Sequence, residues 1–564
     1  MTPRGTLVQD GAFATRRLEV EFNLAEISEV IAAAIPDREM LVWRDRRLTY
    51  AQVAERTRRL GNYLRSRGLG ARRERSELAG WESGQDHVAL YLYNCPEYIE
   101  GMLGAYKART APFNVNYRYV DEELVYLLRD AKARAIVYHA AFAPTLARIR
   151  PQLPELEVLL QVADESRNAL LPGAVEYEAA LASAASARPP LEPSPDDLYI
   201  LYTGGTTGMP KGVLWRQADI FVAALGGRGP GGAEPASYAE IAERVKAGGA
   251  KSLPTPPLMH GAAHWASFNG FHSGNTLVFQ GITDRFDPHD ALATIEREKI
   301  NVMLIVGDAF ARPLLDQLRA RTYDLSSLFA LVSGGAALNA TLKKELLELL
   351  PKVMIIDAVG SSETGSQAQN ISTAASGATT GTFTLGHGAC VLSEDLSRVL
   401  EPGHEGLGWF AQTGRVPLGY FGDREKTERT FPAIEGVRYS VPGDRARLRA
   451  NGVLELLGRD SVTINSGGEK IFAEEVEHAL KSHPAVFDAV VCGRPSERWG
   501  NEVVAIVRLC EGKPTSEAEL LEECAKHIAR YKLPKAFLFR DEIVRSPSGK
   551  ADYRWAKEQA SIRA

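Results

Sequence analysis

A segment rich in glycine and threonine at residues 202–212, YTGGTTGMPKG, carries the groups that bind a polyphosphate. Its small residues let backbone N–H groups approach an anion, its hydroxyls donate hydrogen bonds, and the ammonium of Lys211 adds positive charge. The segment follows the apolar run LYILY, which predicts a strand. It is not a Walker A loop, because Lys211 lies between Pro210 and Gly212. A ligand-free turn is the alternative for this segment alone, but threonine and glycine this densely mixed favour phosphate binding.

A carboxylate, Glu363, stands in the segment GSSETG at residues 360–365, directly after the apolar run VMIIDAV. The ends of strands are where α/β sheets place their ligands. A carboxylate oxygen is a hard ligand that could hold Mg²⁺ on a nucleotide. For this motif alone, a cap between a strand and a helix is an equally good interpretation.

Two other sequence patterns are excluded. Residues 227–232, GRGPGG, match GxGxxG, but they lie in a proline-containing loop that neither ends a strand nor begins a helix. Residues 360–364 fail the GxSxG pattern because position 364 is threonine. The sequence therefore predicts neither a dinucleotide fingerprint nor a hydrolase nucleophile at these positions.

These residues are carried by a long chain in which expected strands and helices alternate. Between about residues 24 and 400, apolar runs such as HVALYLYN alternate with amphipathic segments such as EYIEGMLGAYKA, which predicts βα units around mainly parallel sheets. A polar stretch rich in Gly, Ala and Pro at residues 226–257 predicts a surface excursion. After about residue 443 short strands and turns take over, and a small α+β domain is expected to begin near Gly458. The length of 564 residues suggests roughly three to five structural units.

Composition excludes several classes of function. The chain has 66 basic and 71 acidic residues, a formal charge of −5 and no sustained basic tract, which disfavours a nucleic-acid or anionic-membrane surface. Five dispersed cysteines without a CxxC pair disfavour a disulfide framework and a zinc site. No apolar run approaches the roughly 18 to 20 residues that span a bilayer, and neither end matches a secretory or peroxisomal signal. We therefore expect a cytoplasmic protein that acts on small molecules.

The chain contains five characteristic segments, in the order YTGGTTGMPKG, VGSSETG, VPGDRARL, GRDSVTINSGGEKIFAEEVE and SPSGKADYRW. Together these segments resemble the adenylate-forming acyl-CoA synthetase superfamily. That superfamily also contains luciferases and the adenylation domains of peptide synthetases. The resemblance extends from about residue 25 to residue 560. Within it, LWRQADIF, PPLMHGAAHWASF and GDAFARPLL are similar to the fatty-acyl and steroid side-chain CoA ligase branch.

The resemblance implies an α/β fold and a two-step reaction. A large N-terminal domain, residues 1–457, would combine layered βα sheets with a β-barrel-like part. A hinge at residues 458–461 would join it to a small, mobile α+β C-terminal domain, residues 462–564. ATP would first join a carboxylate to AMP with release of pyrophosphate, and coenzyme A would then take the acyl group and release AMP. Both steps develop negative charge, which cations and N–H donors stabilise. The expected substrate is a hydrophobic carboxylate, either a medium- or long-chain fatty acid or a steroid side chain.

The resemblance also assigns an ATP site. Glu363 would bind Mg²⁺, and Ser362 would lie beside the α-phosphate. Asp444 would accept both ribose hydroxyls, with Arg459 as a second ribose contact. Lys550 matches the lysine that bridges the substrate carboxylate and the α-phosphate. The other expected nucleotide contacts are Thr203, Gly204, Gly205, Thr206, Thr207, Gly208 and Lys211 of the phosphate loop, and Gly334, Gly335, Ala336 and Asp357 of the adenine wall.

The acyl and coenzyme A sites have fewer matched residues. His260 matches a histidine near the carboxyl end of the acyl site, and we expect it to position the substrate, because a carboxylate attacks without losing a proton. The turn with Gly467, Gly468 and Lys470 resembles the loop along which pantetheine passes. Trp499 either faces the coenzyme A nucleotide or is a packed surface aromatic, two equally good interpretations. The expected catalytic set is Lys550, Glu363, Ser362, Thr203 and His260.

Three positions depart from the family pattern. Val359 stands where an aromatic residue usually stacks on adenine, so we expect weaker stacking or compensation by a neighbour. Ser461 replaces the usual Asp or Lys of the hinge, but hinge function is a backbone property, so Ser461 is expected to serve. Residues 306–308, Val-Gly-Asp, replace Val-Pro-Thr near the acyl channel and make its shape less predictable.

Other functions share part of this pattern. An adenylation enzyme that serves a separate carrier protein, or a luciferase-like oxidase, would carry the same motifs, and an assay without coenzyme A separates them from a CoA ligase. Glu363, Asp444 and Lys550 argue against a catalytically silent nucleotide-binding protein. No nucleic-acid partner or transmembrane segment is expected, and a homodimer is one option for the oligomeric state.

Overall fold

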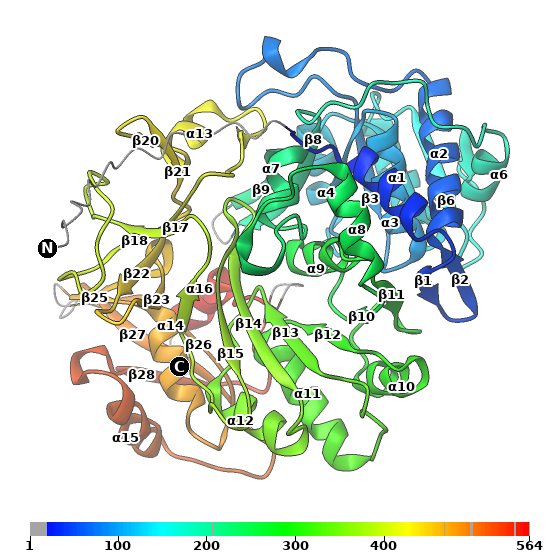
Figure 1. Cartoon of the computed structure of the whole chain (residues 1–564). Helices are drawn as coiled ribbons and strands as arrows, with labels where there is room; N and C mark the ends of the chain where they lie inside the picture. The colour runs from blue at the N-terminus through cyan, green and yellow to red at the C-terminus, as the bar shows by residue number, and fades with distance from the viewer. Residues whose placement is uncertain (1–19, 206–207, 467–468, 497–499, 546–548, 563–564) are drawn as a thin grey trace, which may run out of the picture.

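The computed structural model describes residues 20–205, 208–466, 469–496, 500–545 and 549–562 (Figure 1). The fold is α/β, with two large sheets and a β-hairpin sheet in the N-terminal part and a separate sheet at the C-terminal end. No helix in the described ranges is both long and apolar enough to cross a membrane.

The first βα units build a five-stranded parallel sheet. Helices cover both of its faces, which is why the apolar runs of β3, β4 and β6 are buried along their whole length. In spatial order its strands are β4 (Ala111–Asn114), β3 (His87–Tyr91), β5 (Ala133–His139), β6 (Val158–Val162) and β7 (Ala174–Glu176). The helices of this region are α1 (Leu24–Ala34), α2 (Tyr50–Ser66), α3 (Pro96–Lys107), α4 (Asp121–Asp130), α5 (Ala143–Ile149) and α6 (Tyr177–Ala182), with short η1 (Arg75–Glu77), η2 (Ala140–Phe142) and η3 (Arg150–Gln152).

The second sheet begins with parallel strands next to an antiparallel edge strand. In spatial order these strands are β2 (Arg46–Thr49), β1 (Glu39–Trp43), β11 (Thr276–Phe279), β10 (Lys251–Pro254), β12 (Val302–Ile305), β13 (Ala330–Gly334) and β14 (Met354–Ser361). All neighbours from β1 to β14 are parallel, and β2 is antiparallel to β1. The helices that connect the strands are α9 (Gly261–His272), α10 (Pro288–Glu298), α11 (Gly307–Ala320) and α12 (Ala340–Leu349).

The same sheet continues with antiparallel strands, which correspond to the expected β-barrel-like part. In spatial order they are β15 (Gly365–Ser372), β16 (Thr382–Leu385), β23 (Val453–Arg459), β22 (Asp444–Leu448), β18 (Gly408–Thr413), β21 (Val437–Ser440) and β20 (Ala433–Ile434), with β17 (Ala389–Leu392) beside β18. Among the described strands these close no barrel: β20 ends the sheet at an edge. The expectation of a barrel-like part is therefore corrected to an open extension of the main sheet.

A three-stranded sheet carries the predicted phosphate-binding segment. Its strands are β8 (Leu198–Gly205), β9 (Gly208–Arg216) and β19 (Gly419–Tyr420), and helix α7 (Gln217–Ala223) follows β9. The expected surface excursion at 226–257 instead contains a packed helix, α8 (Tyr238–Lys246), after η4 (Pro230–Gly232). Ile241 and Val245, one helical turn apart, are buried in the core that also contains α1. Helix α13 (Arg424–Thr430) follows β19.

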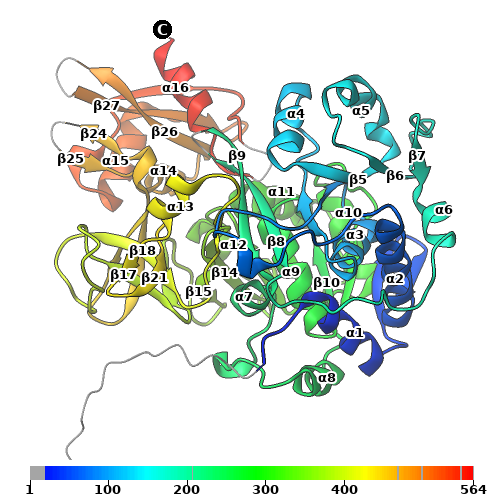
Figure 2. The ribbon, with the colours of Figure 1, turned by 90° about the horizontal axis from the view of Figure 1, so that it is seen from above.

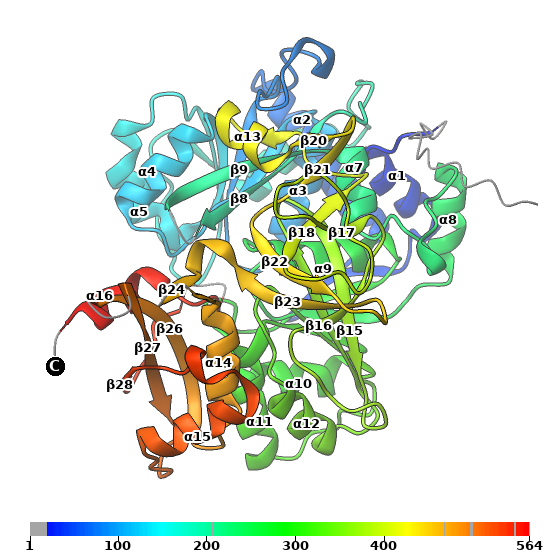
Figure 3. The ribbon, with the colours of Figure 1, turned by 90° about the vertical axis from the view of Figure 1, so that its left-hand side faces the viewer.

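The C-terminal part has its own sheet and its own hydrophobic core. Its strands are β25 (Glu469–Ile471), β24 (Ile464–Ser466), β27 (Gly500–Leu509), β26 (Val486–Ser496) and β28 (Ala536–Phe539), and its helices are α14 (Ala473–Lys481), α15 (Glu517–His527) and α16 (Tyr553–Ser561), with η5 (Asp460–Val462) and η6 (Arg530–Lys532). Figure 2 shows this part beside the N-terminal sheets, and Figure 3 shows β23 leading into it. A single short connection after β23 therefore joins two separately packed bodies.

Candidate active site

A cavity of about 1650 Å³ lies where the N-terminal sheets, the β8–β9 hairpin and the C-terminal part meet. The carboxyl ends of the parallel strands β12 to β14 point into it, as expected for ligand sites in α/β sheets. Its walls bring together residues that the sequence separates by more than three hundred positions. Six predicted site residues line it: Thr203, His260, Gly334, Gly335, Ser362 and Lys550.

The hairpin of β8 and β9 is held in place at the cavity by Asn114. The amide nitrogen of Asn114 donates to the carbonyls of Tyr202 (2.8 Å) and Met259 (2.7 Å), and its oxygen accepts the N–H of Tyr202 (2.8 Å). One buried side chain thus ties the strand before the phosphate segment to the chain just before His260. Sequence reasoning missed Asn114, although its place at the end of an apolar run is a recognisable signal.

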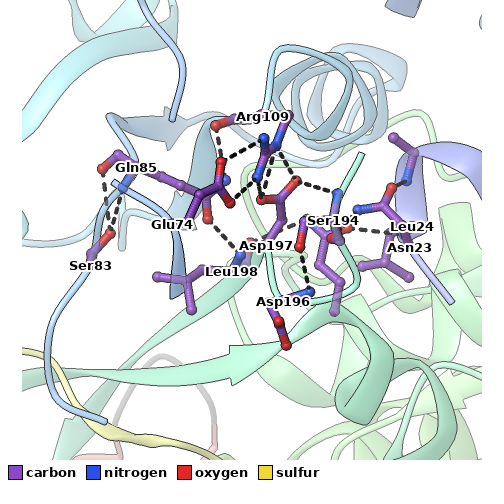
Figure 4. Close-up of polar contacts among 12 residues, drawn as sticks. Asn23, Leu24, Glu74, Ser83, Gln85, Arg109, Ser194, Asp196, Asp197 and Leu198 are labelled. Atoms are coloured by element: carbon purple, nitrogen blue, oxygen red, sulfur yellow. Dashed lines mark hydrogen bonds and ion pairs between the residues drawn. The ribbon is translucent and has the colours of Figure 1, made fainter. Parts of the chain in front are cut away.

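The first residue of β8 is anchored by a second polar network (Figure 4). The guanidinium of Arg109 donates to Asp197 (2.9 Å) and to Glu74 (2.9 Å). The backbone carbonyl of Arg109 accepts from the Gln85 amide (2.9 Å), and the Gln85 oxygen accepts the N–H of Leu198 (2.6 Å). Strand β8 is thus held at Leu198 and at Tyr202, the residue just before Thr203.

Lys211 extends from β9 opposite Thr203, its cross-strand partner. Its ammonium lies 3.7 Å from Asp130 and 3.8 Å from Asp423. Burial disfavours the charged form, but Asp130, Tyr126 and Asp423 outweigh it and raise the pKa of Lys211. The lysine is therefore a cation beside the phosphate segment. Strands β8 and β9 include the backbones of Gly204, Gly205 and Gly208, whereas Thr206 and Thr207 lie outside the described residues.

Glu363 lies in the turn between β14 and β15 and is oriented by two hydroxyl groups. The phenol of Tyr420 donates to its carboxylate (2.7 Å), and the hydroxyl of Ser440 donates to its backbone carbonyl (2.6 Å). Burial and the charge of Glu363 raise the pKa of Tyr420, so the phenol keeps its proton. The indole N–H of Trp215 donates to the backbone carbonyl of Ser362 (2.8 Å). This hydrogen bond fixes the backbone directly before Glu363.

The donor set at Glu363 fits Mg²⁺ that arrives with a nucleotide. No cluster of three or more His, Cys, Asp or Glu side chains suited to a metal occurs in the described ranges. Mg²⁺ is commonly held by one or two carboxylates together with substrate phosphates and water. Glu363 supplies one such carboxylate, with its second oxygen not engaged by Tyr420.

The predicted adenine wall is only partly on the cavity surface. Ile356 and Ala358 of β14 line the cavity, so Asp357 between them points to the opposite face of the strand. There its carboxylate pairs with the fully buried ammonium of Lys343 (2.8 Å). Burial raises the pKa of Asp357 and Lys343 opposes the change. Asp357 therefore offers the cavity no carboxylate, and a contact through its backbone stays a prediction.

The other predicted wall residues and departures lie close to this strand. Gly335 adopts a φ of +90°, a backbone conformation suited to glycine, and together with Gly334 it leaves the cavity wall without side chains. Ala336 packs against the core beneath. Val359 lines the cavity where the family pattern has an aromatic ring.

Asp444 and Arg459 are cross-strand partners on β22 and β23, immediately before the connection to the C-terminal part. The Arg459 guanidinium lies 3.3 Å from the Asp444 carboxylate. Asp444, Glu363 and Glu474 together raise the pKa of Arg459. Glu474, near the start of α14, also accepts the backbone N–H of Arg459 (3.0 Å). The end of β23 therefore contacts the C-terminal part directly.

Lys550 and His260 face the cavity from opposite bodies. Burial and the charge of Arg459 lower the pKa of Lys550, while Glu363 and Asp444 oppose that change. Burial lowers the pKa of His260 to about 3, with smaller contributions from Lys550 and Arg118. His260 is therefore neutral at physiological pH, and its Nε2 is buried with no partner among the described residues. An imidazole with so low a pKa is a poor proton acceptor, and its vacant Nε2 is suited to positioning a ligand.

An apolar channel leads from this site between α9 and the main sheet. Ala262, Ala266 and Gly270 lie four residues apart on α9, so their small side chains share one face and keep the channel open. Val302 and Leu304 of β12 share the facing side of the sheet. Val332, Ile356 and Ala358 complete this wall. His260 was expected near the carboxyl end of the acyl site, whereas the course of the channel was not predicted from the sequence.

The predicted coenzyme A contacts belong to the C-terminal sheet. Lys470 lies in β25, which pairs with β24. Gly467, Gly468 and Trp499 lie outside the described residues. Ser461, at the proposed hinge, lines the cavity within η5.

Comparison with known proteins agrees with this geometry. The family model described as "AMP-binding enzyme" matches residues 29–421, and the "AMP-binding enzyme C-terminal domain" model matches residues 475–550. The chain is 57% identical over 541 residues to "Medium-chain acyl-CoA ligase Mig" of Mycobacterium avium, covering 96% of this chain and 98% of the relative. It is 41% identical over 553 residues to "3-oxocholest-4-en-26-oate--CoA ligase" of Rhodococcus rhodochrous, covering 96% of both chains.

The fold is also found among solved structures. An anthranilate CoA ligase, AuaEII, in complex with anthranoyl-AMP superposes with a TM-score of 0.80 at 22% identity, covering 97% of this chain and 99% of the other. At that identity the likeness shows the fold. The large N-terminal body, the small C-terminal body and their order along the chain are thus shared.

Proposed function

The chain belongs to the AMP-binding enzyme family as an ATP-dependent acyl-CoA ligase, and from this premise we propose that its substrate is a hydrophobic carboxylic acid, a fatty acid or a steroid side chain. The observation that carries the proposal is the continuity of one cavity, which joins Thr203, Ser362 and Lys550 to the apolar channel along α9. The names of relatives support it: a medium-chain acyl-CoA ligase at 57% identity and a steroid-acid CoA ligase at 41%.

We propose that the first step takes place where the cavity meets the hairpin. The hairpin donors and Lys211 would hold the β- and γ-phosphates, and Asp444 would hold the ribose. Lys550 would stabilise the negative charge shared by the attacking carboxylate and the α-phosphate. Mg²⁺ held by Glu363 would neutralise phosphate charge. Support comes from Thr203, Ser362 and Lys550, which line one cavity, and from Arg459, Glu363 and Asp444, whose charges act on the pKa of Lys550.

His260 is proposed to position the substrate carboxylate at the channel mouth. Its pKa of about 3 removes it as a general base near neutral pH, and its vacant Nε2 can accept or donate one hydrogen bond as the tautomer requires. The carboxylate is already ionised at neutral pH, so no proton has to be removed before attack.

For the second step, the C-terminal part is proposed to rotate about residues 458–461. Support comes from its separate core and from the short connection after β23. The thiol of coenzyme A would then attack the acyl carbon and AMP would leave, which regenerates the free enzyme. Gly467, Gly468, Lys470 and Trp499 remain the proposed contacts of coenzyme A.

The proposed setting is the cytoplasm, where all five cysteines, free in the structure, would stay reduced. A homodimer stays an expectation, which sedimentation analysis of the purified protein tests.

The test of this function is AMP release with ATP, coenzyme A and a panel of carboxylic acids. We expect AMP and acyl-CoA to form in equal amounts with medium-chain or longer apolar acids and not with acetate. AMP release that is independent of the acid would refute the proposal. Acyl-adenylate made without any transfer to coenzyme A would instead favour delivery to a carrier protein.

A further inference from the structure

The first turn of helix α11 contacts the C-terminal part of the chain (Figure 3). The carboxylate of Asp308, the second residue of α11, lies 3.4 Å from the ammonium of Lys481 at the end of α14. One helical turn further along α11, the guanidinium of Arg312 lies over the Phe487 ring on β26, 5.7 Å from its centre. The two bodies therefore meet at α11 as well as at the end of β23.

Asp308 is held so that its carboxylate faces Lys481. One of its oxygens accepts the backbone N–H of Asn339 (2.8 Å), and the other faces the ammonium. The side chain of Lys481 is only 10% exposed and that of Asp308 only 17%, so solvent screens this pair less than an ion pair at the surface. Position 308 is also one of the departures from the family pattern, in which a threonine would bring no charge.

Inside the C-terminal part, a series of polar contacts runs from Lys481 to the loop that carries Lys550. Lys481 also lies 3.2 Å from Asp488 on β26. Both carboxylate oxygens of Asp488 accept from the guanidinium of Arg545 (2.6 Å each). Arg545 in turn donates to the backbone carbonyl of Gly549 (3.1 Å), the residue before Lys550. The lysine that faces α11 is thus linked to the backbone beside Lys550.

The same loop packs directly on the start of α11. Gly549 has a φ of +77°, and a Cβ there would lie 3.2 Å from Cγ1 of Val306 and 3.8 Å from Cβ of Ala309. The residues around Asp308 therefore form the surface on which this loop rests. A displacement of the C-terminal part at α11 would move Lys550 relative to the cavity.

The two groups at the centre of the series are charged near neutral pH. Burial disfavours the ammonium of Lys481, but Asp488 and Asp308 outweigh it and raise its pKa. Burial also opposes ionisation of Asp488, but Lys481 and Arg545 lower its pKa to about 2. The contact between α11 and α14 is therefore one between a carboxylate and a cation whose charge is maintained.

We propose that Asp308 is a positioning residue for acyl-adenylate formation: its charge holds Lys481, and with it the C-terminal part, in the orientation in which Lys550 faces the cavity. The inference rests on the proposed function, because it needs Lys550 to act in the first step. When the C-terminal part rotates for the second step, the pair between Asp308 and Lys481 breaks, while Asp488 and Arg545 move together with Lys481. Loss of the Asp308 charge therefore shifts the balance between the two half-reactions.

The experiment compares the two half-reactions in Asp308→Asn, which removes the charge but keeps an oxygen for the N–H of Asn339. Acyl-adenylate formation is measured in a single turnover with ATP and decanoate, and acyl-CoA formation is measured from supplied decanoyl-adenylate and coenzyme A. We expect the ratio of the first rate to the second to fall by roughly 5- to 10-fold, between the effect of an exposed ion pair and that of a charged hydrogen bond. A ratio measured within one variant is independent of how much of the protein is folded.

Lys481→Met tests the same contact from the other body and is expected to lower the ratio as well. Combining it with Asp308→Asn should lower the ratio no further, because the pair is already broken. Asp316→Asn is the matched control, since Asp316 is an exposed aspartate on the same helix. This control is expected to keep the wild-type ratio.

Three outcomes would count against the inference. A wild-type ratio in Asp308→Asn, including equal losses in both rates, would overturn it and leave the ligase function intact. Additive effects of Asp308→Asn and Lys481→Met would also overturn it, because they would show that the two side chains act separately. If the wild type forms no acyl-adenylate with any acid of the panel, the proposed function itself fails and the inference fails with it.

Discussion

Replacing Gly458 by alanine is expected to slow acyl-adenylate formation far more than thioester formation. Gly458 has a φ of +127°, and a Cβ there would lie 1.6 Å from Oε2 of Glu474. That same oxygen accepts the backbone N–H of Arg459 (3.0 Å). Because Glu474 belongs to the C-terminal part and Arg459 ends β23, their contact fixes the orientation in which Lys550 faces the cavity.

The size of the effect follows from two costs. Burial and the nearby Glu477 and Asp444 raise the pKa of Glu474 to about 8, so near pH 7 the hydrogen bond is largely that of a neutral carboxyl. Its loss costs about 1 kcal/mol, and an overpacked contact costs about 1–3 kcal/mol more. The orientation shown here would thus lose about 2–4 kcal/mol, roughly 30- to 1000-fold in population. Backbone strain at Gly458 adds to this in both orientations and does not separate the half-reactions.

The assay measures acyl-adenylate formation in a single turnover, and separately acyl-CoA formation from a supplied acyl-adenylate. Glu474→Ala on the Gly458→Ala background removes the clash and is expected to recover most of the first rate. Equal losses in both half-reactions, with no recovery in the double variant, would refute the role given to this contact. Together with the wild type and the other two variants, Glu474→Ala alone completes a double-mutant cycle, which measures the coupling between positions 458 and 474.

Three further predictions concern groups around the site. Tyr420→Phe removes the 2.7 Å hydrogen bond to Glu363 and is expected to raise the Mg²⁺ concentration for half-maximal activity by roughly 10-fold; an unchanged Mg²⁺ dependence would contradict this. Lys343→Met leaves the Asp357 carboxylate buried without a partner and is expected to destabilise the fold by about 3–5 kcal/mol, whereas Lys343→Met with Asp357→Leu should regain much of it in thermal unfolding. Burial lowers the pKa of His264 from 6.5 to about 3, so its contribution to stability is full above pH 6.5 and is lost as the pH falls toward 3. At pH 5.5 the loss is about 1.4 kcal/mol, and His264→Gln should flatten the pH dependence of the unfolding free energy; an equal slope in both proteins would count against burial of the neutral imidazole.

The family resemblance assigned residues from separate motifs to one site, and strand adjacency alone would not have done so, because β8 belongs to the antiparallel hairpin sheet, Ser362 follows β14 of the main sheet and Lys550 belongs to the C-terminal part. Thr203, Ser362 and Lys550 all line the cavity although they are spread over most of the chain. Side-chain direction was harder to predict. Asp357 lies in the expected strand, but alternation along β14 turns its carboxylate toward Lys343 and away from the cavity.

Long-range partners gave no local signal in the sequence. Tyr420 supports Glu363 from 57 positions downstream, and only the packing of β19 against β9 brings the two together. The packed helix α8 was missed because Ile241 and Val245 were hidden in a stretch rich in glycine and alanine. The course of the channel also depends on which strands neighbour α9, a property of topology that periodicity does not contain.

The central claim is that Lys550 serves acyl-adenylate formation in a ligase that works in two separable steps. The most direct test is Lys550→Ala supplied either with ATP and decanoate or with preformed decanoyl-adenylate and coenzyme A. The account predicts that the variant loses acyl-adenylate formation by about 100-fold or more, in line with the loss of one transition-state charge contact, and still makes decanoyl-CoA from the supplied adenylate at near wild-type rate. Undiminished acyl-adenylate formation by the variant would contradict it.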